Sequence, residues 1–300
     1  MPTYQCNGTC AFCYLGKQVK QTEVLSLHVL QEKLWSIDKR YQCNLNIEVF
    51  GGEITLLDYQ YVRDLLKLCN QYSFGDVGIV TNLTNVEYVK QLIDDGVPVA
   101  VSWNEERGRV GKKAMSNLLS LDNKYRTAID LQIVCLPSVI KQGAQSLLDM
   151  VESLCVRSVT ILQYYPAVQS KKQYSVNNEQ YQQFMLEFVD IYNNNDYTFK
   201  VGNLDLWKSR YDCKQSSNIF IAPNGKYAVT VYDQDGKESF EYFDDLKTYD
   251  DICSKELVTY VNKCITCRLF NNCLAEHLRF DQQSVCCGLP ALTQYVQSKL

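Results

Sequence analysis

The chain has 300 residues and a formal net charge of −4, and 46% of its residues are apolar. This length suffices for one large domain with an appendage, or for two domains that each bury a core. The charge excludes a basic nucleic-acid footprint, and no apolar run reaches the roughly 20 residues of a membrane span. Because Cys6 precedes any apolar stretch that a signal peptide would need, we expect a cytoplasmic globular protein.

Helical and strand patterns alternate from residue 22 to about residue 193. The predicted helices cover residues 22–37, with Thr22 as N-cap, then 59–69, 85–95, 113–121, 143–154 and 178–193. The predicted strands cover residues 45–50, 77–82, 97–103, 129–136 and 158–165, and a stub before Cys6. This repetition implies a parallel sheet with right-handed crossovers and an active site at the carboxyl ends of the strands.

The pattern changes near residue 200. Residues 217–233 predict a hairpin around Pro223, Asn224 and Gly225, and a cysteine-rich segment with little periodicity follows. We therefore predict two domains, an α/β domain over residues 1–200 and a small metal-stapled domain over residues 201–300.

Fourteen cysteines are many for a cytoplasmic protein, where thiols stay reduced, so clustered cysteines favour metal binding. They gather in an N-terminal group (Cys6, Cys10, Cys13) and a C-terminal group (Cys264, Cys267, Cys273, Cys286, Cys287). Three thiolates spaced CxxxCxxC can hold three irons of a [4Fe–4S] cube and leave the fourth iron open to a small chelating ligand. The alternative is a zinc site whose fourth ligand lies elsewhere.

Two motifs together point to a family. CxxxCxxC with Phe12 before its last cysteine resembles the cluster loop of radical S-adenosylmethionine enzymes, and Gly51, Gly52 and Glu53 resemble the Gly-Gly-Glu motif of that family. The resemblance implies a partial (β/α)6 barrel, a catalytic [4Fe–4S] cluster and S-adenosylmethionine as cofactors. It implies that the glycines let the backbone approach the ligand, and that Glu53 accepts hydrogen bonds from the methionine ammonium group.

Further cofactor contacts follow from the same resemblance. Asn82 and Ser102 end the strands at 77–82 and 97–103, where the family contacts S-adenosylmethionine. Arg109 stands where related enzymes direct an arginine toward the cofactor carboxylate. All three positions are also ordinary places for polar loop residues.

The C-terminal cysteines read CxxCxxxxxC and resemble the SPASM/Twitch auxiliary-cluster domain of this family. The resemblance implies that Cys264, Cys267, Cys273 and Cys286 hold one auxiliary [4Fe–4S] cluster, with Cys287 as the alternative last ligand. Thr230 and His277 stand where the pattern expects cysteines of another auxiliary cluster, which leaves Cys213 without its partners. We therefore expect one auxiliary cluster and no cube at Cys213, and a zinc site remains the alternative for this segment.

The function implied by the resemblance is radical chemistry on a peptide. In this family the reduced cluster cleaves S-adenosylmethionine, and the resulting 5′-deoxyadenosyl radical abstracts hydrogen from the substrate. We expect an oxidoreductase that matures a ribosomally made precursor peptide through a thioether or carbon–carbon crosslink. A flavodoxin or ferredoxin would donate electrons, and a separate peptide-binding protein is a further expected partner. The alternatives are an epimerase with Cys213 as hydrogen donor, a small-molecule enzyme, and a zinc-stapled binding protein without catalysis.

Overall fold

The computed structural model describes residues 1–42, 45–164, 172–212, 218–232, 238–269, 273–274 and 289–299. Five parallel strands form the main sheet and follow one another in chain order. They are β1 (Ile79–Thr81), β2 (Val99–Trp103), β3 (Ile129–Cys135), β4 (Ser158–Gln163) and β5 (Lys200–Val201). The predicted parallel α/β fold is confirmed.

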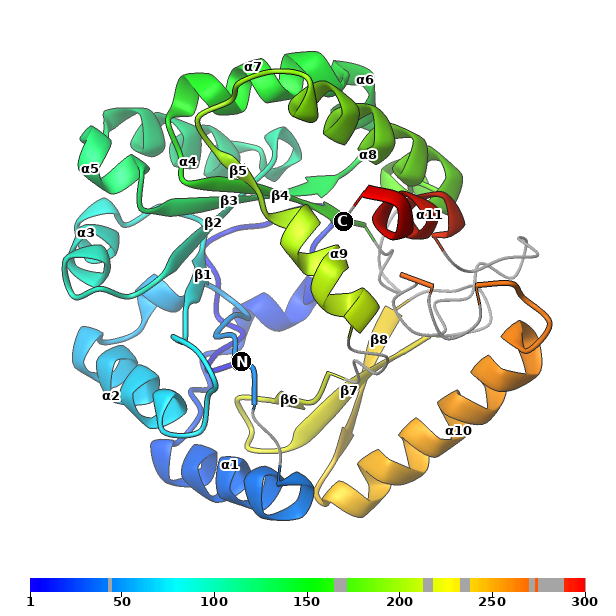
Figure 1. Cartoon of the computed structure of the whole chain (residues 1–300). Coiled ribbons are helices and arrows are strands. Elements are labelled where there is room, and N and C mark those ends of the chain that lie inside the picture. Colours follow the sequence, from blue (N-terminus) through cyan, green and yellow to red (C-terminus); the bar gives the residue numbers. More distant parts are fainter. Residues whose placement is uncertain are drawn as a thin grey trace.

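Helices cover the outer side of this curved sheet (Figure 1). They are α1 (Leu27–Tyr41), α2 (Tyr59–Asn70), α3 (Val86–Asp94), α4 (Arg109–Ser120), α5 (Asn123–Arg126), α6 (Pro137–Gln142), α7 (Ala144–Leu154) and α8 (Asn178–Asn193). Short 3₁₀ turns lie between them: η1 (Gly16–Lys20), η2 (Ile54–Leu56), η3 (Glu105–Arg107) and η4 (Lys172–Tyr174). No helix in the described ranges is long and apolar enough to cross a membrane.

The two faces of the sheet differ in burial. In β3 the side chains of Ile129, Leu131 and Ile133 are fully buried under the helices, whereas Gln132 and Val134 between them are only partly buried. Because successive side chains of a strand point to opposite faces, Gln132 and Val134 line the inner side of the barrel. The inner side of β3 is therefore less completely buried than its outer side.

The N-terminal segment extends the sheet beyond β1. The amide nitrogens of Gly52 and Glu53 donate to the carbonyl oxygens of Thr3 and Gln5, at 2.9 and 2.7 Å. Val49 in turn pairs in parallel with Ile79 of β1. The strand predicted over residues 45–50 is thus present as isolated bridges rather than as a regular strand.

The first helix begins later than its pattern suggests. Leu25 donates its amide to the carbonyl oxygen of Pro2, at 2.8 Å, and Val24 forms an antiparallel bridge with Thr3. These contacts keep the backbone extended up to Ser26, which is the N-cap of α1. The prediction of Thr22 as N-cap is therefore wrong.

The C-terminal part adds a second, antiparallel sheet and three further helices (Figure 1). It contains an antiparallel sheet of β6 (Phe220–Ile221), β7 (Tyr227–Tyr232) and β8 (Glu238–Phe243), and the helices α9 (Gly202–Asp212), α10 (Leu246–Cys264) and α11 (Pro290–Lys299). The predicted hairpin is confirmed as β6 and β7, with Gly225 in its turn at a φ of 75°. The strand β8 and these three helices were not expected.

Candidate active site

The loop of the N-terminal cysteines crosses the carboxyl edge of the parallel sheet. At one end Asn7 meets Asn82, the residue after β1, with 2.8 Å between the Asn82 amide nitrogen and the Asn7 side-chain oxygen. At the other end Phe12 packs on Leu136 and Tyr164, which follow β3 and β4, with 6.2 Å between the ring centroids of Phe12 and Tyr164. The cysteines therefore lie where parallel α/β folds place their active sites.

Two of the three cysteine thiols, those of Cys6 and Cys10, lie next to Gly8. A β-carbon added to Gly8 would lie 3.4 Å from the Cys6 sulfur and 3.6 Å from the Cys10 sulfur. Burial raises the pKa of both thiols, and the nearby Arg107 guanidinium opposes this rise in the pKa of Cys10. Cluster binding must therefore displace protons from these sulfurs.

The three-cysteine loop fits an iron–sulfur cube. Cys6, Cys10 and Cys13 are all half-buried and belong to one loop, and thiolates are the ligands that such clusters take. Among the described residues, no three cysteine, histidine or acidic side chains converge on the position of a single metal ion. The thiolates of a cube bind different irons and need no such common point.

A ring of polar side chains fixes the start of this loop. The Asn7 amide donates to the Thr84 hydroxyl at 2.8 Å, and the Thr84 hydroxyl donates to the Asn82 side-chain oxygen at 2.7 Å. The Asn82 amide completes the ring at Asn7 and lies 4.0 Å from the Cys6 sulfur. Asn82, predicted as a cofactor contact, therefore also anchors the cysteine loop to the end of β1.

Gly51 and Gly52 are required by the protein itself. A β-carbon on Gly52 would lie 2.1 Å from the carbonyl oxygen of Gln5, and one on Gly51 would lie 2.7 Å from that of Thr3. Gly51 also has a φ of 145°, which side-chain-bearing residues rarely adopt. The close approach that these glycines permit in the described residues is to the N-terminal segment just before the cysteine loop.

Glu53 is turned into the protein and is 1% exposed. One carboxylate oxygen accepts from the Thr55 amide at 3.1 Å and from the hydroxyls of Thr55 and Thr81, both at 2.6 Å. The other accepts from the backbone amide of Asn82 at 2.7 Å. The expected contact of Glu53 with the methionine ammonium group stays a prediction, whereas its bonds join the Gly-Gly-Glu segment to the end of β1.

Arg107, rather than the predicted Arg109, contacts the cysteine loop within the described residues. Its guanidinium carbon lies 5.7 Å from the centre of the Phe12 ring, and one of its nitrogens donates to the Ser102 hydroxyl. Its Nε is buried and has no hydrogen-bond partner in the described part of the chain. Arg109 is instead exposed at the first residue of α4. Sequence reasoning missed Arg107, although it stands only two positions away.

Glu48 is a second residue that the sequence analysis missed. Water reaches its side chain, yet the surrounding protein raises the pKa of its carboxyl group, and nearby Gln132 of β3 opposes this rise. A carboxylate between Ile47 and Val49, in an alternating apolar segment, is the signal that could have revealed this inward position.

The C-terminal cysteine group is described in part. Cys264 ends α10, Cys267 donates its amide to the Cys264 carbonyl oxygen at 2.8 Å, and Cys273 accepts from the Thr293 hydroxyl of α11 at 3.9 Å. The remaining predicted residues lie outside the described ones: Cys213, His277, Cys286 and Cys287. The auxiliary cluster therefore stays a prediction.

Comparison with solved structures identifies the fold. anSMEcpe with bound AdoMet has a TM-score of 0.66 at 13% identity, over 98% of this chain and 94% of that one. SuiB of Streptococcus suis bound to S-adenosylmethionine has a TM-score of 0.67 at 16% identity, over 93% and 72%. SuiB bound to its precursor peptide SuiA has a TM-score of 0.56 at 14% identity, over 75% and 57%.

No family model matches the sequence, and no curated protein matches it either. At 13–16% identity the likeness to the solved structures concerns the fold. The chain therefore has the same fold as these two proteins, both solved with S-adenosylmethionine bound, and the parallel α/β fold predicted from the sequence agrees with it.

Proposed function

We propose that the protein is a radical S-adenosylmethionine enzyme that modifies a peptide. The observation that carries this proposal is the position of Cys6, Cys10 and Cys13 on one loop across the carboxyl edge of a parallel sheet. When bound there, a [4Fe–4S] cluster would supply the electron that cleaves S-adenosylmethionine. The residues of the chain bind and orient the cofactor and keep water from the reacting atoms.

The number of clusters tests this proposal. Thr230 lies in β7 where the resemblance expects a thiolate, and a neutral hydroxyl is a poor ligand for iron in a cube. We expect about eight irons per chain after anaerobic reconstitution, which corresponds to one catalytic and one auxiliary cluster. Colorimetric assays measure the iron and the sulfide. The catalytic cluster should support formation of 5′-deoxyadenosine. About twelve irons would contradict the loss of the other auxiliary cluster, and zinc in a colourless protein would contradict the enzyme.

Arg107 is proposed to bind the cofactor carboxylate in place of Arg109. Arg107→Met should raise the dissociation constant of S-adenosylmethionine roughly tenfold to a hundredfold, since a hydrogen bond to a charged group contributes about 1.5–3 kcal/mol. Arg109→Met is the matched control, because it removes the same charge from an exposed position. Equilibrium dialysis of the reconstituted protein measures both constants. A larger effect of Arg109→Met would restore the original assignment.

A precursor peptide is the proposed substrate, and a thioether or carbon–carbon crosslink is the proposed product. The support for a peptide is the similarity in fold to SuiB, whose solved structure holds the precursor peptide SuiA. Co-expression with candidate peptides and mass spectrometry distinguishes the products, because a crosslink removes two hydrogens. An unchanged mass after reaction in H2O, with one deuterium at an α-carbon after reaction in D2O, would instead favour the epimerase.

A further inference from the structure

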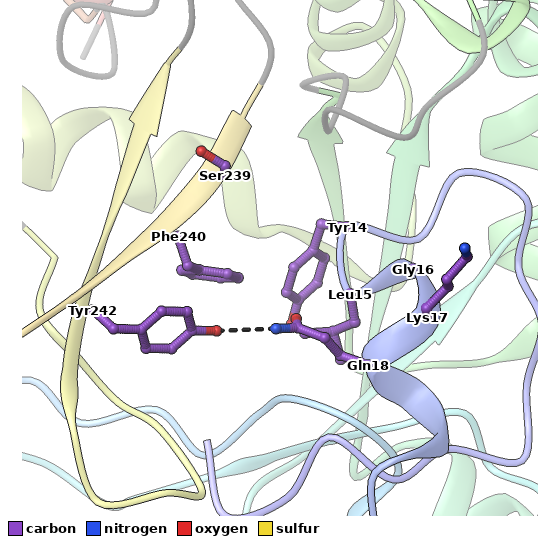
Figure 2. A pocket seen from close by; sticks show the side chains of 8 residues that line it. All are labelled: Tyr14, Leu15, Gly16, Lys17, Gln18, Ser239, Phe240 and Tyr242. Atoms are coloured by element: carbon purple, nitrogen blue, oxygen red, sulfur yellow. Dashed lines mark hydrogen bonds between the residues drawn. The ribbon is translucent and has the colours of Figure 1, made fainter.

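A cavity of about 480 Å³ lies between β8 and the segment that follows Cys13. Figure 2 shows Phe240 and Tyr242 of β8 on one side and Tyr14 and Gln18 of the cysteine-loop segment on the other. Its volume falls within the range of roughly 300–1,000 Å³ that is typical of ligand pockets. Nothing in the proposed chemistry at the cysteines uses this cavity.

Aromatic rings form its walls. The ring centroids of Tyr14 and Phe240 are 5.8 Å apart at an interplanar angle of 66°, and those of Phe240 and Tyr242 are 6.3 Å apart at 47°. The first pair is edge-to-face and the second is tilted, and aromatic rings prefer an edge-to-face arrangement that another ring can adopt with them. The walls therefore favour an aromatic guest over an aliphatic one.

The polar groups of the cavity can hydrogen-bond a guest whose aromatic ring carries a hydroxyl group. The Gln18 amide nitrogen donates to the Tyr242 hydroxyl at 3.2 Å, which holds the amide at the cavity (Figure 2). The side-chain oxygen of the same amide is an acceptor that it can offer to a guest. Tyr242 is held in turn by the Tyr4 hydroxyl, at 2.8 Å. Lys17 lies at the exposed rim of the cavity. A tyrosine side chain offers both the apolar ring and the hydrogen-bond donor.

The position of the cavity points to the peptide substrate. Tyr14 follows Cys13 directly, and its hydroxyl lies 3.5 Å from the carbonyl oxygen of Gly51. A guest in the cavity is thus held beside the loop proposed to carry the catalytic cluster. Within the described residues β8 is also the last strand of its sheet, and edge strands are common docking sites for extended peptides.

We propose that this cavity anchors an aromatic side chain, best a tyrosine, of the peptide substrate. The inference rests on the proposed peptide-modifying function and adds a specificity site to it. The anchor fixes the register of the peptide, and the residue to be modified lies at a set distance from the anchor.

Blocked amino acids test the anchor without knowledge of the peptide. Saturation-transfer NMR on the anaerobic full chain compares N-acetyltyrosinamide, N-acetylleucinamide and N-acetylalaninamide. We expect the tyrosine probe to bind at least fivefold more tightly than the leucine probe, and the alanine probe not to bind. Phe240→Leu should lower the affinity for the tyrosine probe at least fivefold. Phe74→Leu is the matched control, because Phe74 lies outside the cavity and is 81% exposed, and it should leave the affinity for the tyrosine probe unchanged.

Gln18→Leu supplies a second variant in case Phe240→Leu does not fold. It should remove the preference for N-acetyltyrosinamide over N-acetylphenylalaninamide, because the acceptor for the hydroxyl is lost. Equal binding of the leucine probe, or tyrosine binding that survives both changes, overturns the assignment. Formation of 5′-deoxyadenosine is assayed separately: its absence with tyrosine binding intact refutes the radical chemistry, and its presence without tyrosine binding refutes the anchor.

Discussion

Simultaneous replacement of Cys6, Cys10 and Cys13 by alanine is expected to abolish formation of 5′-deoxyadenosine, down to the rate without protein. The three thiols are the proposed ligands of the catalytic cluster, and alanine offers no donor atom to iron. Iron bound by the C-terminal cysteine group should remain at about four per chain. Anaerobic chromatography of the products and iron counting on the same sample measure both quantities.

A cysteine outside the groups serves as the control for this variant. Cys155 adopts a left-handed conformation at the end of α7, with a φ of 53°, which asparagine tolerates well. Cys155→Asn should therefore retain both the iron and the activity. Activity in the triple variant, or loss of all iron from it, would refute the assignment of the catalytic cluster.

Gly52→Ala is expected to lower the free energy of unfolding by on the order of 3 kcal/mol and to impair cluster loading. The added methyl group would lie 2.1 Å from the carbonyl oxygen of Gln5, so that the N-terminal segment must move away. This movement breaks the hydrogen bond from Glu53 to Gln5, directly before Cys6. Urea denaturation of the cluster-free protein measures the loss of stability, and iron counting measures the loading.

Gly75→Ala is the matched control for that substitution. A β-carbon on Gly75 would have no atom within 4 Å, and its backbone φ is not in the left-handed region. Its free energy of unfolding should stay equal to, or rise slightly above, that of the wild type. Equal stability of Gly52→Ala and the wild type would show that residues 3–5 do not pack against this segment as described.

Local sequence signals predicted the ends of some helices. Helix α8 begins and ends where its pattern does, because Asn177 and Gln180 form a capping box and the apolar positions recur at helical spacing. Gly96, with a φ of 78°, likewise ends α3 as its position suggests. These signals depend only on residues within a few positions of one another.

Contacts between distant parts of the chain could not be predicted from the sequence. The extended backbone before α1 results from pairing with Pro2 and Thr3, which a helical pattern over residues 22–37 does not reveal. From the sequence alone, Arg107 and Arg109 are equally plausible cofactor-binding residues. In the structure the turn η3 directs Arg107 toward Phe12 and leaves Arg109 exposed. The spacing of the cysteines identified their loop, but the atoms that position this loop come from β1, Thr84 and Gln5.

The contacts between the N-terminal segment and the antiparallel sheet bear on the order of folding. The Met1 nitrogen donates to Ile221 across 220 positions, the Tyr4 and Tyr242 hydroxyls meet across 238, and Arg40 of α1 pairs with Asp250 across 210. Such separations raise the contact order, and closing long loops slows folding. During synthesis the cysteine loop leaves the ribosome well before β8, which packs against Tyr14 directly after Cys13. The nascent chain therefore passes through a stage in which the N-terminal thiols are accessible to whatever delivers iron and sulfide, before the antiparallel sheet pairs with the N-terminal segment.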